Sequence, residues 1–129
     1  MAITALDHLV LTVADIDASI RFYTQVLGMA VVTFGDNRKA LQFGKQKINL
    51  HQKHHEIKPN ARHADTGTAD LCLLTDTPLI QVMDILTSFG VEILQGGIVD
   101  RTGAVGRIRS VYCYDPDGNL LEISQYATD

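Results

Sequence analysis

The sequence predicts an α+β fold made of two βαβββ modules, and three observations support this prediction. An apolar stretch of strand type opens at His8, and a second one opens at Asp70. Gly28 follows His8 by twenty residues, and Gly90 follows Asp70 by the same number. Both glycines stand where a helix would end on a residue of left-handed conformation. We therefore expect a single domain over residues 1–129 in which one unit of structure occurs twice.

The first module is expected to span about residues 4–52. Asp15 is a suitable N-cap for a helix that ends near Leu27, because apolar residues recur at helical spacing after it. Three short segments of strand type follow, and the glycine-containing turns between them indicate antiparallel hairpins. The expected strands are 7–13, 30–34, 39–43 and 47–52.

A polar linker at residues 53–67 separates this module from the second, which is expected to span about residues 68–126. An extended chain of that length reaches about 45 Å. The linker can therefore join two modules of one subunit or pass to a partner subunit.

The second module repeats the order of the first. Thr77 and Pro78 predict the start of a helix, since proline suits the first helical position. The apolar stripe of this helix is made by Leu79, Val82, Met83, Leu86 and Phe89. The expected strands are 69–75, 91–94, 107–114 and 119–124, with a glycine-rich loop at 95–106.

Composition and charge exclude several classes of function. The formal net charge is -4 and the basic residues are scattered, which argues against a nucleic-acid surface. The sequence shows no secretory signal pattern and no apolar run of membrane-spanning length. Cys72 and Cys113 lie in apolar runs without metal-knuckle spacing, so we expect both to be reduced and buried. A cytoplasmic protein is the resulting expectation.

Four polar side chains are predicted to lie on the strand faces that the helices leave uncovered. Side chains alternate between the two faces of a strand, and these four lie opposite the apolar positions: His8, His51, Asp70 and Glu122. Two imidazoles and two carboxylates around one point suit a divalent ion such as Zn, Ni, Mn or Fe. We therefore predict a metal site formed by these four residues.

The four residues also occupy repeated positions. One histidine and one carboxylate open the first strand of their modules. The other two, His51 and Glu122, each follow an aromatic residue by eight positions, with a turn between them (Phe43 and Tyr114). Taken singly, each residue also suits an ordinary structural role. The linker histidines are alternatives to Asp70 as a ligand: His54, His55 and His63.

The chain resembles the vicinal oxygen chelate superfamily, which comprises glyoxalases, bleomycin resistance proteins and extradiol dioxygenases, and within it the virulence-associated glyoxalase-like branch. The resemblance lies in residues 7–13 (Asp-His-Leu-Val-Leu-Thr-Val), in residues 22–29, and in residues 114–122 (Tyr-Asp-Pro-Asp-Gly-Asn-Leu-Leu-Glu). It implies curled mixed sheets that form a metal-containing cleft.

The resemblance also implies a homodimer with shared sites. His8 and His51 would come from one subunit, and Asp70 and Glu122 from the other. The ligand pattern departs from bacterial glyoxalase I, which usually has a glutamate in place of His51 and a histidine in place of Asp70.

The resemblance implies several functions that act on a small molecule. The first is a lyase or isomerase of the lactoylglutathione lyase type, with Glu122 as general base, a metal that binds vicinal oxygens, and glutathione as a potential co-substrate. The alternatives are a non-haem iron dioxygenase of extradiol type, a thiol transferase of fosfomycin-resistance type, and a non-enzymatic resistance protein that binds a small molecule.

Overall fold

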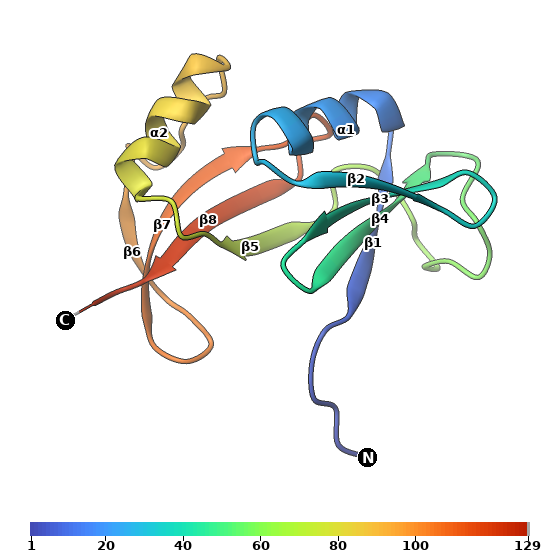
Figure 1. Ribbon diagram of the computed structural model, residues 1–129, viewed down its shortest axis with the longest axis horizontal. Helices are drawn as coiled ribbons and strands as arrows, with labels where there is room; N and C mark the ends of the chain where they lie inside the picture. Colours follow the sequence, from blue (N-terminus) through green and yellow to red (C-terminus); the bar gives the residue numbers. More distant parts are fainter. Residues whose placement is uncertain (129) are drawn as a thin grey trace. The chain divides into compact units, whose positions relative to one another are not determined.

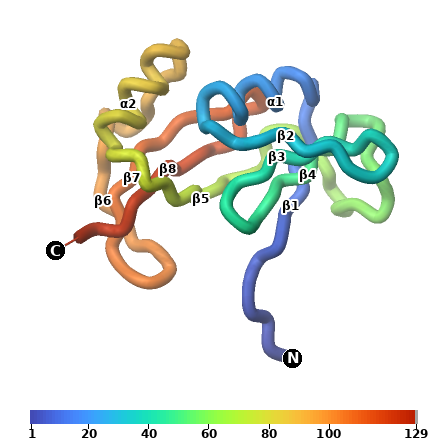
Figure 2. The backbone as a smooth tube through the Cα atoms, in the orientation of Figure 1, coloured from blue at the N-terminus to red at the C-terminus, as the bar shows by residue number. Residues whose placement is uncertain are grey.

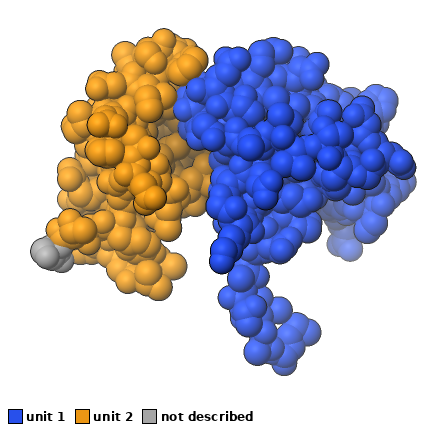
Figure 3. Space-filling view, viewed as in Figure 1, with its two compact units in different colours: residues 1–67 blue, residues 68–129 orange. Residues whose placement is uncertain are grey.

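The computed structural model describes residues 1–128, and it confirms the α+β fold with two βαβββ modules. Contacts divide the chain into two compact units, Met1–Gly67 and the residues from Thr68 onward (Figure 3). Each unit has one helix and a mixed sheet of four strands (Figure 1). Within the described residues, none of the helices is long and apolar enough to cross a membrane.

Unit 1 has the strand order β1-β4-β3-β2, in which β1 is parallel to β4 and the other pairs are antiparallel. Asp15 caps its helix as predicted, since Asp15 Oδ1 accepts hydrogen bonds from the backbone N–H groups of Asp17 and Ala18 at 2.9 and 3.2 Å. The elements are β1 (His8–Val13), α1 (Ile16–Gln25), β2 (Ala30–Phe34), β3 (Arg38–Phe43) and β4 (Gln46–Gln52).

The core of unit 1 lies between α1 and one face of this sheet. Tyr23 of α1 is fully buried, and it shares the core with apolar residues from β1, β3 and β4: Leu11, Val13, Leu41, Ile48 and Leu50. Because strand side chains alternate, the other face of the sheet carries the polar positions of β1 and β4. That face includes both histidines predicted for this module, His8 and His51.

Unit 2 has the corresponding order β5-β8-β7-β6, with β5 parallel to β8. Its helix packs against β7 and β8, where Leu86, Val111 and Leu121 are buried. The elements are β5 (Asp70–Leu74), α2 (Leu79–Ser88), β6 (Val99–Thr102), β7 (Arg107–Tyr114) and β8 (Leu120–Tyr126).

The structure corrects two predictions for unit 2. The expected strand at 91–94 is absent from the described chain, and β6 lies at Val99–Thr102, inside the expected loop. A hairpin causes this shift, because Gly103 donates its backbone N–H to Gly106 at 2.7 Å and β6 then pairs with β7. Phe89, expected in the apolar stripe, is 51% exposed because it follows the last turn of α2.

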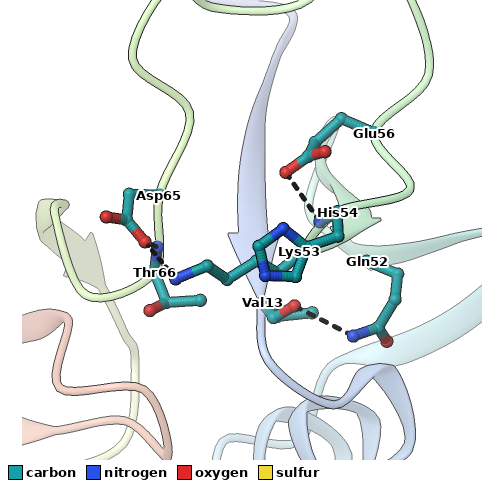
Figure 4. A network of polar contacts seen from close by, with 7 residues as sticks. All are labelled: Val13, Gln52, Lys53, His54, Glu56, Asp65 and Thr66. Atoms are coloured by element: carbon teal, nitrogen blue, oxygen red, sulfur yellow. Dashed lines mark hydrogen bonds and ion pairs between the residues drawn. The ribbon is translucent and has the colours of Figure 1, made fainter.

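The linker at 53–67 contains no helix or strand and connects β4 to the second unit (Figure 2). Its ends are held together by polar contacts (Figure 4). Lys53 donates its backbone N–H to Val13 at 2.9 Å, and its Nζ lies 2.8 Å from Asp65 Oδ1. The same Asp65 oxygen accepts the backbone N–H of Thr66 at 2.7 Å. The linker is therefore anchored at β1 and closed on itself by an exposed ion pair.

Candidate functional site

The uncovered face of unit 1 carries His8 and His51 at opposite ends of the parallel β1–β4 pair. His8 is paired with Lys47, whereas His51 is paired with Thr12, four residues further along β1. Four residues of strand correspond to about 13 Å along the sheet. Asn49, which is paired with Val10, stands between the two histidines on the same face.

His8 is exposed and is oriented by its neighbour in sequence. Its Nδ1 lies 2.8 Å from Asp7 Oδ2. A carboxylate at one ring nitrogen fixes the orientation of the imidazole and leaves Nε2 free, as in many metal-binding histidines. The geometry therefore suits His8 to act as a ligand through Nε2.

His51 has a different environment, because it is only 5% exposed. Its Nε2 lies 3.5 Å from Nη2 of Arg38. Burial lowers the pKa of His51, and the positive charge of Arg38 lowers it further. A neutral imidazole is the form that binds a metal or accepts a hydrogen bond.

The uncovered face of unit 2 brings Asp70 and Glu122 onto adjacent strands. Asp70 pairs with Leu120 and Cys72 pairs with Glu122, so the two carboxylates are separated by one strand spacing and two residues. That offset places their Cα atoms about 8 Å apart on one face, which is within reach of a shared ion. Asp70 is exposed and Glu122 is half-buried.

Glu122 is held by a chain of hydroxyl groups from β7 and β8. Ser110 donates its hydroxyl to Glu122 Oε2 at 2.5 Å, and the Ser110 and Ser124 hydroxyl oxygens lie 2.7 Å apart. Cys72 Sγ lies 3.3 Å from the Ser124 hydroxyl. Both serines are fully buried. The carboxylate is therefore fixed in position on one side and retains accepting capacity on the other.

Tyr112 flanks Glu122 on β7, since the two residues are directly paired. Arg101 donates from Nε to the Tyr112 hydroxyl at 3.1 Å, and its guanidinium lies 5.4 Å from the centre of the tyrosine ring. Burial raises the pKa of Tyr112. The phenol therefore stays protonated at neutral pH beside the Glu122 carboxylate.

The strand pairing corrects the predicted equivalence of His51 and Glu122. Glu122 is paired with the residue two positions after Asp70, and in unit 1 Asn49 is paired with the residue two positions after His8. Asn49 therefore holds the position that corresponds to Glu122.

The eight-residue offset fails because the two hairpin loops differ in length. Phe43 is paired with Gln46 across two residues, whereas Tyr114 is paired with Leu120 across five. Equal counting from the aromatic residues therefore does not reach equivalent positions in the two sheets.

Sequence reasoning missed Asn49 and the two serines. Asn49 is 5% exposed, and its Oδ1 is buried without a hydrogen-bond partner among the described residues. The sequence feature that could have indicated Asn49 is its place between the apolar residues Ile48 and Leu50.

The structure corrects the prediction for Cys72. This cysteine was predicted to be buried and is exposed, because it lies on the uncovered face of β5.

The donor set fits a divalent ion by its chemistry, since it combines imidazole nitrogens with carboxylate oxygens. Over residues 1–128, three or more His, Cys, Asp or Glu side chains do not come together in a group that could hold a metal. The pair that one sheet brings together is Asp70 and Glu122. A common ion for all four predicted ligands remains a prediction.

Comparisons with known proteins give a consistent result. The family model described as Glyoxalase/Bleomycin resistance protein/Dioxygenase superfamily matches residues 5–123. Virulence protein STM3117 of Salmonella typhimurium is 56% identical over 126 residues, which cover 98% of this chain and 87% of that protein. Its crystal structure matches with a TM-score of 0.96 at 55% identity, covering 98% of this chain and 100% of that one. Glyoxalase domain-containing protein RDO1 of Mycosarcoma maydis is 48% identical, covering 98% of this chain and 70% of that protein.

Two more distant proteins carry names of activities. Metallothiol transferase FosB of Staphylococcus epidermidis is 28% identical, with 95% of this chain and 82% of that protein covered. The crystal structure of lactoylglutathione lyase from Agrobacterium tumefaciens has a TM-score of 0.73 at 21% identity, with 96% and 95% covered. At 21% identity, the similarity to lactoylglutathione lyase concerns the fold alone.

Proposed function

We infer the function from family membership, because this chain belongs to the glyoxalase/bleomycin resistance protein/dioxygenase superfamily. The proposed activity is that of a metal-dependent lyase or isomerase acting on a small molecule with two neighbouring oxygens. The observation that carries this proposal is Glu122, whose carboxylate is fixed by Ser110 on the same sheet face as Asp70.

The proposed ligands of a divalent ion (Zn, Ni, Mn or Fe) are His8, Asp70 and Glu122, and His51 is the predicted fourth ligand although it lies about 13 Å along the sheet from His8. Asn49 competes with His51 for the fourth place, because it holds the position equivalent to Glu122. When bound, the ion supplies Lewis acidity toward the two substrate oxygens.

Glu122 is proposed as the general base that removes a proton from the carbon next to the substrate carbonyl. Ser110 holds the Glu122 side chain in place during this transfer through its hydrogen bond to Oε2. Tyr112 stays protonated and can donate its hydroxyl hydrogen to the carboxylate or to a substrate oxygen.

The test measures bound metal and turnover together. We expect His8→Ala, Asp70→Ala and Glu122→Gln each to weaken metal affinity roughly tenfold or more. Comparison of His51→Gln with Asn49→Ala identifies the fourth ligand, and Glu92→Gln, at an exposed position outside both sheets, is the control matched to Glu122→Gln. The substrate for turnover is the adduct of methylglyoxal and glutathione. Unchanged metal content in the His8 and Glu122 variants would contradict the proposed site.

Transfer of a thiol to an electrophile is the second candidate, favoured by the 28% identity to metallothiol transferase FosB over nearly the whole chain. The same ligands and the same small-molecule class would serve it, with glutathione or another thiol as co-substrate. Fosfomycin-dependent loss of free thiol, without conversion of the methylglyoxal adduct, would select this candidate. Consumption of dioxygen by iron-loaded protein would instead select extradiol chemistry.

We also propose that the protein is a homodimer with sites shared between subunits. In this arrangement each site takes His8 from one subunit and Asp70 with Glu122 from the other. The cysteines at 72 and 113 are both free, which supports a reducing compartment such as the cytoplasm.

A further inference from the structure

A cluster of polar and aromatic residues surrounds the two candidates for the fourth ligand on the uncovered face of unit 1, and its other members have no role in the proposed chemistry. We call it the Arg38 cluster, and it comprises Phe34, Arg38, Lys47, Asn49 and His51. Phe34 is paired with Arg38 across β2 and β3, and the other three residues alternate along β4. All five side chains therefore stand on one face.

Two cations of the cluster share one aromatic ring. The Arg38 guanidinium carbon lies 4.8 Å from the centre of the Phe34 ring, and Lys47 Nζ lies 3.8 Å from the same centre. Cation–π contacts hold both charges in place without neutralising them. Arg38 and Lys47 form no salt bridge with the carboxylates in residues 1–128.

The side chain that lies within hydrogen-bond distance of Arg38 carries no negative charge. His51 contacts Arg38 through a ring nitrogen at 3.5 Å. Arg38 Nε is buried and lacks a hydrogen-bond partner in the part of the chain that the structure describes. The negative charge of Glu56 raises the pKa of His51, but Glu56 Oε1 accepts the backbone N–H of His54 at 3.1 Å. Within residues 1–128, the two fixed cations therefore have donors available and form no ion pair with a carboxylate.

Asn49 provides a second, independent observation. Asn49 is only 5% exposed, yet its Oδ1 has no hydrogen-bond partner among residues 1–128. The residue paired with it on β3 is Ala40, which offers only a methyl group. A buried amide oxygen without a donor costs free energy unless a ligand supplies one.

We propose that the Arg38 cluster binds a small organic acid, with the carboxylate held by Arg38 and Lys47 and a hydroxyl of the same molecule donating to Asn49. Arginine suits a carboxylate because its planar fork can donate two parallel hydrogen bonds. Phe34 supplies an apolar floor for the carbon skeleton. Binding of the acid by the cluster is independent of the proposed function. Only the further step, that this acid is the substrate of the enzyme, rests on the proposed function.

The experiment follows backbone amide shifts of chelator-treated protein by NMR at low ionic strength during titration with L-lactate, propionate, lactamide and inorganic phosphate. Lactate has both groups, propionate lacks the hydroxyl, and lactamide lacks the charge. We expect lactate to bind tightest, with its shifts concentrated on β3 and β4. Arg38→Met and Lys47→Met should each weaken lactate binding about tenfold or more.

Matched controls are Arg109→Met and Lys45→Met, both on exposed positions outside the cluster, and these should leave lactate binding unchanged. Asn49→Ala should reduce the affinity for lactate to that for propionate. Four outcomes would each overturn the proposal. Lactate does not bind, or it binds no tighter than lactamide. Phosphate binds tighter than lactate, or the Arg38 and Arg109 variants weaken lactate binding equally.

The two proposals fail separately. Arg38-dependent binding of lactate to protein that takes up no metal would refute the metalloenzyme and leave the acid site standing. In active, metal-loaded protein, Arg38→Met should raise KM with little change in kcat, because it removes binding that the ground state and transition state share.

Discussion

Burial lowers the reactivity of Cys113, and the structure confirms the burial that its apolar run predicts. Its side chain is fully buried, and burial, with a smaller contribution from Asp115, raises the pKa of the thiol to about 11. At a pKa of about 11, roughly one Cys113 thiol in a thousand is ionised at pH 8. Only this thiolate form reacts readily with alkylating reagents. We expect iodoacetamide at pH 8 to leave Cys113 unmodified in folded protein and to modify the exposed Cys72 first.

Peptide mass spectrometry at timed intervals measures this difference, with Cys72→Ser as the control that isolates Cys113. Reaction of Cys113 should accelerate as the pH rises toward 11. In denaturant at pH 8, it should proceed at once. If Cys113 in folded protein reacts as fast as it does in denaturant at pH 8, its assigned burial is wrong.

Single residues also show how far the site could be predicted from sequence. Strand alternation correctly places His8, Asp70 and Glu122 on uncovered faces, since it depends only on local periodicity. The roles of Asn49 and Ser110 depend on which residues face each other across strands. Strand register is set by hairpin loop length and strand pairing, so it cannot be deduced by counting residues along the sequence.

At the scale of elements, the turn between β7 and β8 is stabilised by one buried carboxylate. Asp115 is 6% exposed, and its Oδ1 accepts the backbone N–H groups of Asp117 and Asn119, both at 2.9 Å. Its Oδ2 accepts Asn119 Nδ2 at 2.8 Å, and Asn119 Oδ1 in turn accepts the backbone N–H of Ala69 at 2.9 Å. This turn therefore joins the start of β5 to the β7–β8 hairpin.

We predict that Asp115→Ala lowers the free energy of unfolding by roughly 2–4 kcal/mol, because it leaves buried donors without an acceptor. The corresponding fall in Tm is about 8–15 °C for a chain of this size. Asp36→Ala, in the exposed turn between β2 and β3, is the control and should shift Tm by little. Differential scanning calorimetry of both variants decides the matter, and equal Tm values would contradict the role of this turn.

The elements themselves were predictable where periodicity was strong. Both helices and the strands of the first unit follow from apolar spacing and glycine positions, and they lie within two residues of expectation. The strand β6 was missed because Val-Asp-Arg-Thr lacks an apolar repeat and is exposed apart from Val99. Its pairing with β7 comes from the Gly103–Gly106 hairpin, a contact between segments that local propensity does not describe.

At the scale of the whole molecule, duplication supplies two similar sheets that carry different side chains. Unit 1 presents His8 with Asn49, and unit 2 presents Asp70 with Glu122, at equivalent positions. Neither sheet alone provides the three or more ligands that a tightly bound divalent ion needs. A shared site in a homodimer would complete the ligand set, and subunit exchange distinguishes this arrangement from a site within one chain.

We predict that a mixture of His8→Ala and Glu122→Ala dimers regains metal binding and activity. If each site takes His8 from one subunit and Glu122 from the other, a heterodimer has one site with both substitutions and one intact site. Random exchange makes about half of the dimers heterodimers, so about a quarter of all sites should be restored. Elemental analysis and turnover of the mixture measure this fraction, with each variant alone as the control. If both ligands come from one chain, every site in the mixture lacks a ligand, and the mixture stays as inactive as its components.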